Sequence, residues 1–250
     1  MVRSSYSDSF QTPQMVAEYE DIIFGPDSFD SYLWTIQRQF LKKVLDQAAA
    51  SKADRLRILD FACGTGRILE VLEEYSAAPV GVDVSAEMLR RAVTRTGCSE
   101  LRCGELARMV PEDDWDVITA FRFFLNAEPE VRAETMSALA RRLKPDTGRL
   151  IFNVHGNRNS LRHLTLAWHR ARGLPGPVND LSRSQIVLMT KNAGLEILSW
   201  TATGFFPQAF HRTFPSAAFK YLDQCATTFL PRFGIDLMFV CARPSTEATA

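Results

Sequence analysis

The stretch Leu59-Asp60-Phe61-Ala62-Cys63-Gly64-Thr65-Gly66-Arg67-Ile68-Leu69 decides the fold of this 250-residue chain. The apolar run from 57 to 61 has the composition of a buried parallel strand. It stops at two glycines, after which apolar residues recur at helical spacing: Ile68, Leu69 and Leu72. A glycine turn lets the backbone approach a ligand closely, and the first turn of a helix offers unpaired N–H groups to a carboxylate or phosphate. The segment therefore predicts a ligand-binding turn at the end of a strand.

A second buried strand follows, Pro79-Val80-Gly81-Val82-Asp83-Val84-Ser85, and Asp83 comes 19 positions after Gly64 (83 − 64). In nucleotide-binding βαβ units an acid at about this separation meets the ribose hydroxyls. A dinucleotide fingerprint also needs a glycine three residues after Gly66, where this chain has Leu69. A pyrophosphate-binding turn, and with it a nicotinamide oxidoreductase, is disfavoured.

Together the two segments resemble the first two signatures of class I S-adenosylmethionine (SAM)-dependent methyltransferases. The resemblance covers about residues 55 to 155 and continues plausibly to a last strand near 241. It implies a doubly wound α/β fold with a mostly parallel seven-stranded sheet, in the order 3-2-1-4-5-7-6, whose last strand is antiparallel. It also implies SAM as the cofactor.

The resemblance places the cofactor site residue by residue. Backbone from Asp60 to Gly66 would hold the methionine end, Asp83 the ribose hydroxyls, and Met88 would flank the adenine. Glu105 would lie near the adenine amino group, although family members more often have Asp there, and it could instead cap the following segment. The cofactor-binding residues predicted in this way are Asp60, Ala62, Cys63, Gly64, Gly66, Asp83, Val84, Met88, Gly104, Glu105, Leu106 and Phe121.

Around the transferred methyl group we expect Tyr19, Arg122, Phe124 and His155. His155 follows the predicted fifth strand, 149–154, so it lies at the carboxyl edge where open α/β sheets bind ligands. A histidine there could deprotonate an acceptor hydroxyl as the catalytic base. Orienting the acceptor and a purely structural role are the alternatives for His155, and for Tyr19 the alternative is simple packing.

Composition narrows the class of protein. Lysine plus arginine and aspartate plus glutamate both number 29, so no overall field recruits nucleic acid. The five cysteines contain no C-x-x-C pair, and neither a metal site nor a disulfide framework follows. The polar N-terminal segment lacks a signal-peptide core, and no apolar run has the length of a membrane span. A cytoplasmic protein is the simplest interpretation, and its oligomeric state cannot be read from the sequence.

The expected organisation is one domain, in which a helical gate over residues 1–54 belongs with the SAM-binding methyltransferase domain over 55–242, followed by a flexible tail over 243–250. Inserts at about 156–181 and 206–232 would cap the site or form a partner interface. The first insert carries a basic stripe that could meet an anionic acceptor or simply face solvent: Arg158, Arg162, His169 and Arg172. The aromatic-rich stretch from 205 to 229 could line an apolar pocket, form a dimer face or complete the core.

The sequence thus predicts methyl transfer to a small-molecule acceptor, with a hydroxyl favoured, as in O-methylation of a natural product or sugar-type metabolite. N- or C-methylation of a small molecule, methylation of RNA or protein, and a non-catalytic SAM-binding module are the alternatives. After the predicted fourth strand the chain reads Phe121-Arg122-Phe123-Phe124-Leu125-Asn126. This lacks the Asn/Asp-Pro-Pro-Tyr/Phe arrangement of exocyclic-amine methyltransferases, which argues against DNA base methylation.

Overall fold

The structure is a computed structural model that describes residues 12–25, 28–110, 114–173, 179–214 and 216–244. One seven-stranded sheet runs through it in the order β3-β2-β1-β4-β5-β7-β6, as the resemblance implies. Strand β7 is antiparallel to both of its neighbours. The strands are β1 Ile58–Phe61, β2 Val80–Asp83, β3 Glu100–Cys103, β4 Val117–Ala120, β5 Arg149–Val154, β6 Glu196–Thr203 and β7 Asp236–Ala242.

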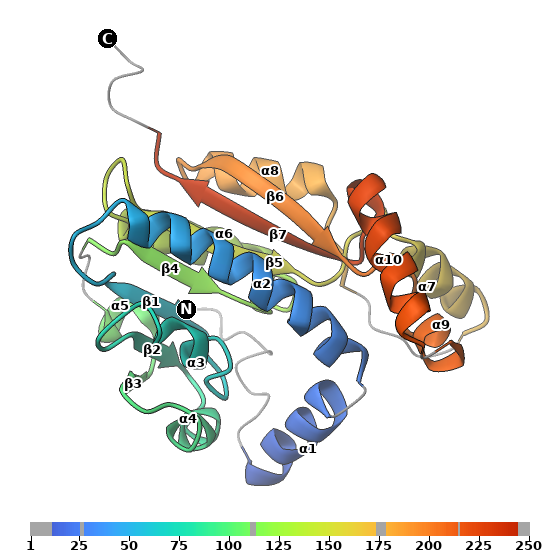
Figure 1. Ribbon diagram of the computed structural model, residues 1–250, viewed down its shortest axis with the longest axis horizontal. Coiled ribbons are helices and arrows are strands. Elements are labelled where there is room, and N and C mark those ends of the chain that lie inside the picture. Colours follow the sequence, from blue (N-terminus) through green and yellow to red (C-terminus); the bar gives the residue numbers. More distant parts are fainter. Residues whose placement is uncertain (1–11, 26–27, 111–113, 174–178, 215, 245–250) are drawn as a thin grey trace.

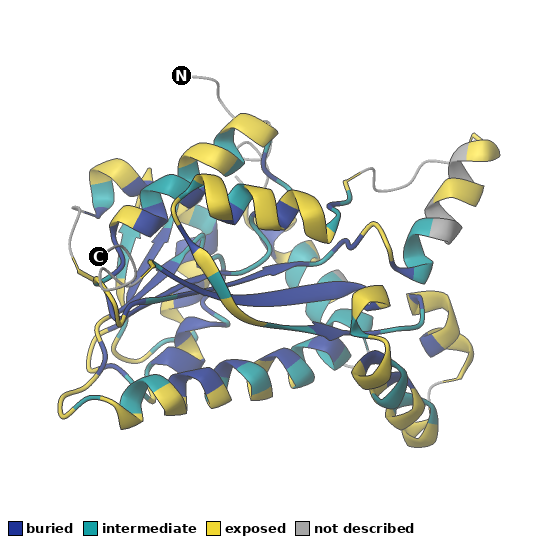
Figure 2. Cartoon of the chain, turned by 90° about the horizontal axis from the view of Figure 1, so that it is seen from above, coloured by how far each residue is buried: buried dark blue, intermediate teal, exposed yellow. Residues whose placement is uncertain are grey.

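Helices cover both faces of the sheet. Helix α2 lies across one face and α6 and α8 lie against the other (Figure 1), so the sheet is the most buried layer when it is seen edge-on (Figure 2). The helices are α1 Pro13–Phe24, α2 Phe29–Ala50, α3 Leu69–Leu72, α4 Ala86–Val93, α5 Leu106–Met109, α6 Pro129–Arg141, α7 Leu161–Ala171, α8 Arg183–Asn192, α9 Gln208–Thr213 and α10 Ala217–Phe229, with a 3-10 turn at Pro231–Phe233.

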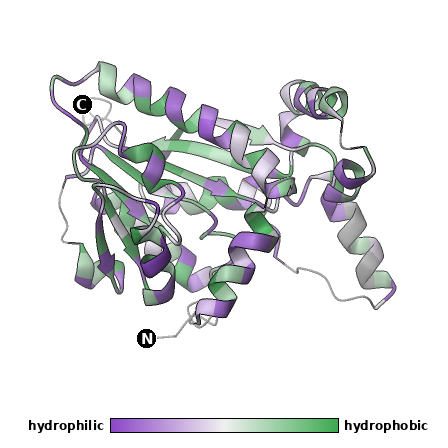
Figure 3. Ribbon diagram, turned by 60° about the horizontal axis from the view of Figure 1, so that its bottom comes forward, coloured by the Kyte–Doolittle hydropathy of each residue, from purple (hydrophilic) through white to green (hydrophobic). Residues whose placement is uncertain are grey.

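The central strands build two cores because consecutive side chains of a strand point to opposite faces. Ile58, Val117 and Ile151 pack beneath α2. Their neighbours Leu59 and Ile118 pack beneath α6 and α8. The strands therefore form the hydrophobic layer, while the helices carry alternating hydrophobic and hydrophilic bands (Figure 3).

The ends of several helices are fixed by local side chains, as their sequences predict. Thr12 Oγ1 accepts a hydrogen bond from Met15 N at 3.3 Å and begins α1, and Ser28 begins α2 in the same way. Ser182 and Gln185 form a capping box at the start of α8. Because these contacts span only a few residues, sequence reasoning finds them well.

The helix predicted directly after the glycine turn is much shorter than expected. Helix α3 has only four residues, and the chain before it stays in turns, with Gly66 N donating to Cys63 O at 3.0 Å. A helix of one turn has little macrodipole, because that dipole is a sum over aligned peptide groups. The start of this helix is consequently a weaker anion-binding feature than the sequence predicts.

The aromatic-rich stretch does not complete the core. It forms α9 and α10 beyond the end of the sheet (Figure 1), where Phe214, Tyr221 and Phe229 are 52%, 70% and 83% exposed. What holds α10 in place is the buried Asp223, whose Oδ2 accepts a hydrogen bond from Tyr32 Oη of α2 at 2.8 Å. The core interpretation is therefore wrong for these three aromatic side chains.

Two remaining expectations concern the periphery. Arg243, in the segment predicted as a tail, donates from Nη1 to Leu143 O at 3.0 Å, and residues 245–250 lie outside the described ranges. Residues 1–11 of the predicted gate also lie outside them. Within the described ranges, no helix has the length and apolar character needed to cross a membrane.

Candidate functional site

The turn after β1 adopts a backbone that favours glycine. The φ angles of Ala62, Gly64 and Gly66 are 55°, 52° and 80°. At Gly66 a Cβ atom would also come within 3.1 Å of side-chain atoms of Ala92 and Thr96. This position needs glycine both for its left-handed conformation and for its close approach to the end of α4.

Asp83 ties the end of β2 to this turn. Its Oδ2 accepts a hydrogen bond from Gly64 N at 2.9 Å, and its Oδ1 accepts one from Ser85 N at 2.8 Å. Burial raises the pKa of Asp83, and hydrogen bonds from the backbone N–H groups of Ser85, Gly64 and Val84 oppose that rise. An ionised carboxylate has about four acceptor sites, so Asp83 retains capacity for a ligand hydroxyl group beside the turn.

Two buried polar atoms at the turn lack hydrogen-bond partners among the residues that the structure describes: Asp60 Oδ2 and Arg67 Nε. The other oxygen of Asp60 accepts a hydrogen bond from Thr119 Oγ1 at 2.6 Å. Burial, reinforced by the charge of Asp83, raises the pKa of Asp60 to about 8. A buried acceptor and a buried donor without partners cost free energy unless a ligand satisfies them. The pair suits a ligand that brings a cationic donor and an anionic acceptor together.

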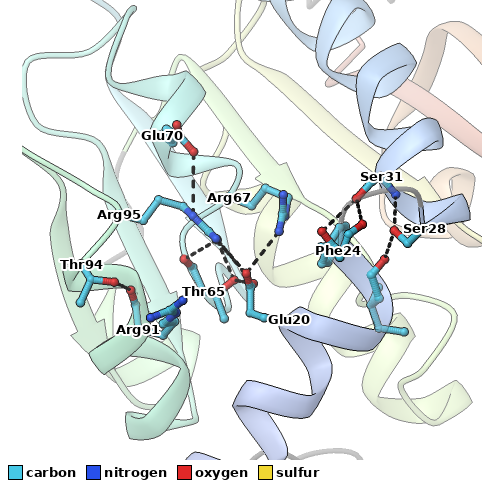
Figure 4. Close-up of polar contacts among 12 residues, drawn as sticks. Glu20, Phe24, Ser28, Ser31, Thr65, Arg67, Glu70, Arg91, Thr94 and Arg95 are labelled. Atoms are coloured by element: carbon cyan, nitrogen blue, oxygen red, sulfur yellow. Dashed lines mark hydrogen bonds and ion pairs between the residues drawn. The ribbon is translucent and has the colours of Figure 1, made fainter.

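Helix α1 is fastened to the turn by Glu20, in a set of contacts that we call the Glu20 clasp (Glu20, Thr65, Arg67 and Arg95; Figure 4). Glu20 Oε2 accepts from Arg95 Nη2 at 2.8 Å and pairs with Arg67 Nη2 at 3.3 Å, and Oε1 accepts from the Thr65 hydroxyl. Burial alone would raise the pKa of Glu20, but hydrogen bonds from Arg95 and Thr65 and the charges of both arginines lower it. The carboxylate is thus held ionised above the turn.

A second polar group, the strand-end cluster, lies where β4, β5 and β7 meet under α2. Arg122 has a φ of 59° and donates its backbone N–H to Asn153 Oδ1 at 2.6 Å, while its guanidinium pairs with Asp30 of α2. Asn153 Nδ2 donates to Asp236 Oδ2 at 2.8 Å, and Gln37 of α2 donates to the same oxygen. Burial raises the pKa of Asp236 to about 7. With His155, these residues make up the cluster.

His155 lies beside this network at the end of β5. The antiparallel pairing of Val154 with Leu237 brings Asp236 to the same end. Burial, followed by the charges of Arg122 and Arg162, lowers the pKa of His155 well below its usual value. The imidazole is therefore neutral at neutral pH and is a weak base.

Tyr19 connects the two polar groups. Burial raises the pKa of its hydroxyl, on which the charges of Arg122, Asp30, Glu20 and Arg67 also act. Its ring packs against Phe24 with 5.7 Å between centroids, and the guanidiniums of Arg67 and Arg122 lie 3.8 Å and 5.5 Å from that same Phe24 ring. Tyr19 therefore lies near both the Glu20 clasp and the strand-end cluster. Figure 1 shows α1 below the end of the sheet toward which β4 and β5 run.

Most of the predicted site residues lie at the glycine turn or in the strand-end cluster. Phe124 does not. Its side chain is fully buried on the α6 and α8 side of the sheet, 5.1 Å between ring centroids from Phe152. His155 belongs with the groups that face α2. Phe124 is therefore a core residue, and its predicted contact with the acceptor is corrected.

The other predicted cofactor residues follow the ends of β1, β2, β3 and β4 in the chain, with Met88 in α4. Met88, Leu106 and Cys63 are buried, whereas Val84 is 47% exposed, and Gly104 and Phe121 lie at strand ends. Glu105 makes no side-chain capping hydrogen bond, and its carboxylate lies 3.8 Å from Arg108. Glu105 thus occupies the N-cap position of α5 without capping the helix through its side chain.

Sequence reasoning missed most residues of the two polar groups: Glu20, Arg67 and Arg95 of the clasp, and Asp30, Gln37, Asn153 and Asp236 of the cluster. Glu20, Asp30 and Asp236 carry no local signal, because each acquires its partner from a distant part of the chain. Arg67 stands inside the diagnostic stretch, and its place directly after the second glycine was the one available clue. Among the described residues, no group of three or more histidines, cysteines or acids is arranged to hold a metal ion.

The known proteins that this chain resembles in sequence are described as methyltransferases. The family described as "Methyltransferase domain" matches residues 33–199. The malonyl-[acyl-carrier protein] O-methyltransferase of Bacillus cytotoxicus is 29% identical over 153 residues, which are 58% of this chain and 51% of that protein. A putative methyltransferase of Geobacillus sp. is 30% identical over 151 residues, 58% of each chain. This chain thus spans little more than half the length of these curated relatives.

Solved structures agree on the fold. Magnesium protoporphyrin IX methyltransferase from Synechocystis PCC 6803, with bound S-adenosylhomocysteine (SAH), superposes with a TM-score of 0.64. The superposition covers 96% of this chain and 98% of that one at 17% sequence identity. The same enzyme with bound SAM superposes with a TM-score of 0.60.

Proposed function

We propose that this chain, which belongs to the methyltransferase-domain family, is a SAM-dependent enzyme that methylates an oxygen atom of a small-molecule acceptor. The observation that carries this proposal is the closeness of the two polar groups. The guanidiniums of Arg67 at the turn and Arg122 at the cluster lie 3.8 Å and 5.5 Å from the Phe24 ring, and Tyr19 packs against that ring. A donor at the turn and an acceptor at the cluster would meet beside Tyr19.

The residues at the turn fit the cofactor. The α-ammonium and α-carboxylate groups of SAM match Asp60 Oδ2 and the Nε–H of Arg67, which have no hydrogen-bond partner among the described residues. The remaining acceptor capacity of Asp83 suits a ribose hydroxyl. When it is bound, SAM supplies a methyl group already activated on a sulfonium. The protein therefore has to align donor and acceptor and exclude water, rather than supply many catalytic groups.

In this proposal the Glu20 clasp keeps α1 in place over the turn, and Arg122 and Tyr19 face the acceptor. A hydroxyl acceptor, which the sequence favours, would need a base, and His155 is the histidine at that place. Neutral His155 is available to accept a proton, but its lowered pKa makes it a weak base. An acceptor oxygen that is already ionised would need no base.

Two other functions remain to be compared. Methylation of RNA would use the basic stripe of the first insert, but Arg158 Nε already pairs with Asp180 Oδ1 at 2.7 Å, which weakens that field. The side chain of His169 lies outside the described part of the chain. A SAM-binding module without catalysis would share the cofactor residues, so product formation separates it from an enzyme.

The test is a screen with methyl-labelled SAM against small oxygen-containing metabolites and total RNA, in which labelled product and released SAH are both quantified. We expect SAH to form in proportion to a labelled small molecule. Label transferred only to RNA, with salt-sensitive binding that is lost when Arg158, Arg162 and Arg172 are replaced by Glu, would contradict the proposal. SAM binding without label transfer to any acceptor would favour the non-catalytic module.

A further inference from the structure

We propose that the acceptor is a carboxylic acid, whose carboxylate Arg122 and Arg162 hold beside Tyr19 and His155 and whose own oxygen receives the methyl group. This inference rests on the proposed function and adds to it the chemical class of the acceptor. The product would be a methyl ester.

The backbone of Arg122 is held in an unusual conformation. Its φ of 59° is uncommon for a residue other than glycine and costs free energy unless the surroundings enforce it. Here Asn153 accepts the Arg122 N–H at 2.6 Å and is itself anchored by Asp236. Such strain at the end of a central strand is characteristic of functional sites, and here it directs the guanidinium toward Asp30 and to 5.5 Å from the Phe24 ring.

The guanidinium of Arg122 retains hydrogen-bonding capacity. A guanidinium carries five N–H donors, and in the described part of the chain Asp30 accepts from Nη1 alone. The side chain is 23% exposed, so a ligand can still reach it. Arginine recognises carboxylates through two parallel hydrogen bonds, which fix both the position and the plane of the acid.

Arg162 of α7 adds a second positive charge to the same place. Burial lowers its pKa, the charge of Asp30 raises it and the charge of Arg122 lowers it again, so the two guanidiniums lie within electrostatic reach of each other. Both charges also act on His155. The charge of Asp180 also raises the pKa of Arg162. Asp180 itself pairs with Arg158, whose Nε lies 2.7 Å from Oδ1, and with His163, whose Nδ1 lies 2.9 Å from Oδ2. A ligand carboxylate would offset the repulsion between the two arginines.

The chemistry of a carboxylate suits a site without a strong base. A carboxylate oxygen would attack the sulfonium methyl carbon, so that the O–CH₃ bond forms as the S–CH₃ bond breaks. The electron pair of the broken bond stays on sulfur, and the products are SAH and a neutral ester. The acid is already ionised at neutral pH, so no proton has to move. A hydroxyl acceptor would instead depend on His155.

Matched acid and alcohol probes test this with the wild-type protein. Phenylacetate is paired with 2-phenylethanol, and hexanoate with 1-hexanol, each with methyl-labelled SAM. We expect label in the acids only, and its release as methanol in alkali, because esters hydrolyse there and ethers do not. Alkali-stable label in the alcohols would overturn the inference while leaving the proposed function intact.

Binding provides a second measurement that does not depend on turnover. Calorimetry with protein saturated with SAH should detect phenylacetate and hexanoate but neither alcohol. If SAH binds and neither acid binds better than its alcohol, the inference is wrong. If SAH itself does not bind, the proposed function fails with it, so the two failures are distinguishable.

Two variants identify the residue responsible. Arg162→Gln should weaken acid binding by about tenfold or more while leaving SAH affinity unchanged, because a charge-assisted hydrogen bond is lost. Arg158→Gln, on the exposed side of the same insert, is the matched control and should leave acid binding unchanged. Equal effects of the two substitutions, or none from Arg162→Gln, would refute the assignment. Arg122→Gln is less informative, because Arg122 also pairs with Asp30.

Discussion

Replacing Glu20 by Gln should release α1 from the glycine turn while leaving the sheet folded. The Glu20 side chain is only 11% exposed and accepts from Arg95 Nη2 at 2.8 Å and from Arg67 Nη2 at 3.3 Å. Glutamine keeps the shape and one oxygen of glutamate but loses its charge and one acceptor. The two arginines would then repel each other without a carboxylate between them.

The expected magnitude follows from these contacts. A hydrogen bond to a charged group contributes roughly 1.5–3 kcal/mol. The substitution removes the charge from both arginine contacts but retains part of the hydrogen bonding, so we expect the free energy of opening α1 to fall by about 2–3 kcal/mol. That is a roughly 30- to 150-fold larger open population. The strands of the sheet do not open with α1, so their backbone amides should keep their protection against hydrogen exchange.

Amide hydrogen exchange measured by mass spectrometry on peptides covering 13–24 and the strands tests this. Glu18→Gln is the matched control, because Glu18 lies on the same helix, is exposed and accepts only from Gln14 Nε2 at 2.9 Å in the described part of the chain. We expect faster exchange in α1 for Glu20→Gln alone. Exchange within about threefold of the control, a difference well below 1 kcal/mol, would refute the view that the clasp holds α1.

The same contact predicts a pH dependence. Burial alone would raise the pKa of Glu20, but its hydrogen bonds and the neighbouring arginines lower it in the folded state. Its contribution is therefore complete above about pH 4.5 and is lost as the pH falls through the folded pKa. After correction for intrinsic exchange rates, α1 of the wild type should lose protection in acid, and α1 of Glu20→Gln should change little.

Three further substitutions have defined outcomes. Asp83→Ala should lower SAH affinity by about tenfold or more and also destabilise the fold, because Gly64 N loses its acceptor; calorimetry and urea unfolding measure the two effects separately. Asp236 has its pKa raised to about 7, so it binds a proton more tightly when folded, and stability should fall as the pH rises from about 4 to about 7. Asp236→Asn should abolish that fall, and urea unfolding at about pH 5 and about pH 8 checks it. Gly66→Ala should cost about 2–4 kcal/mol through its positive φ and the 3.1 Å approach to its neighbours, whereas Gly97→Ala, with its nearest atom at 3.7 Å, should cost much less on urea unfolding.

The centre of the fold could be predicted because its signals are local. The apolar run before Asp60, the two glycines and the acid at Asp83 lie within one βαβ unit, and the contact between Gly64 and Asp83 closes that unit. The capping hydroxyls of Thr12 and Ser28 act on N–H groups three residues later. Short-range chemistry of this kind is fully contained in the sequence.

The partners in the strand-end cluster could not be predicted, because they depend on register. Asn153 and Asp236 meet only because β7 runs antiparallel to β5, and they are 83 positions apart. The position of Gln37 depends in addition on how α2 lies across the sheet. Nothing near Asp236 in the sequence distinguishes it from an ordinary acid at the start of a strand.

Phe124 illustrates a related difficulty. The segment after β4 was expected to border both ligands, and Arg122 does lie in the strand-end cluster. Two residues later the chain has turned to the opposite side, where Phe124 packs with Phe152. Which face each residue takes is set by the left-handed turn at Arg122, and that turn carries no glycine to announce it.

The most direct test of the account is calorimetric titration of the purified protein with SAM and SAH, with NAD as the control ligand. We predict micromolar binding of SAM and SAH, no binding of NAD, and a weakened response to both sulfur ligands in Asp83→Ala. No binding of either sulfur ligand to the folded wild type would contradict the central claim, because the glycine turn would then be only part of the scaffold.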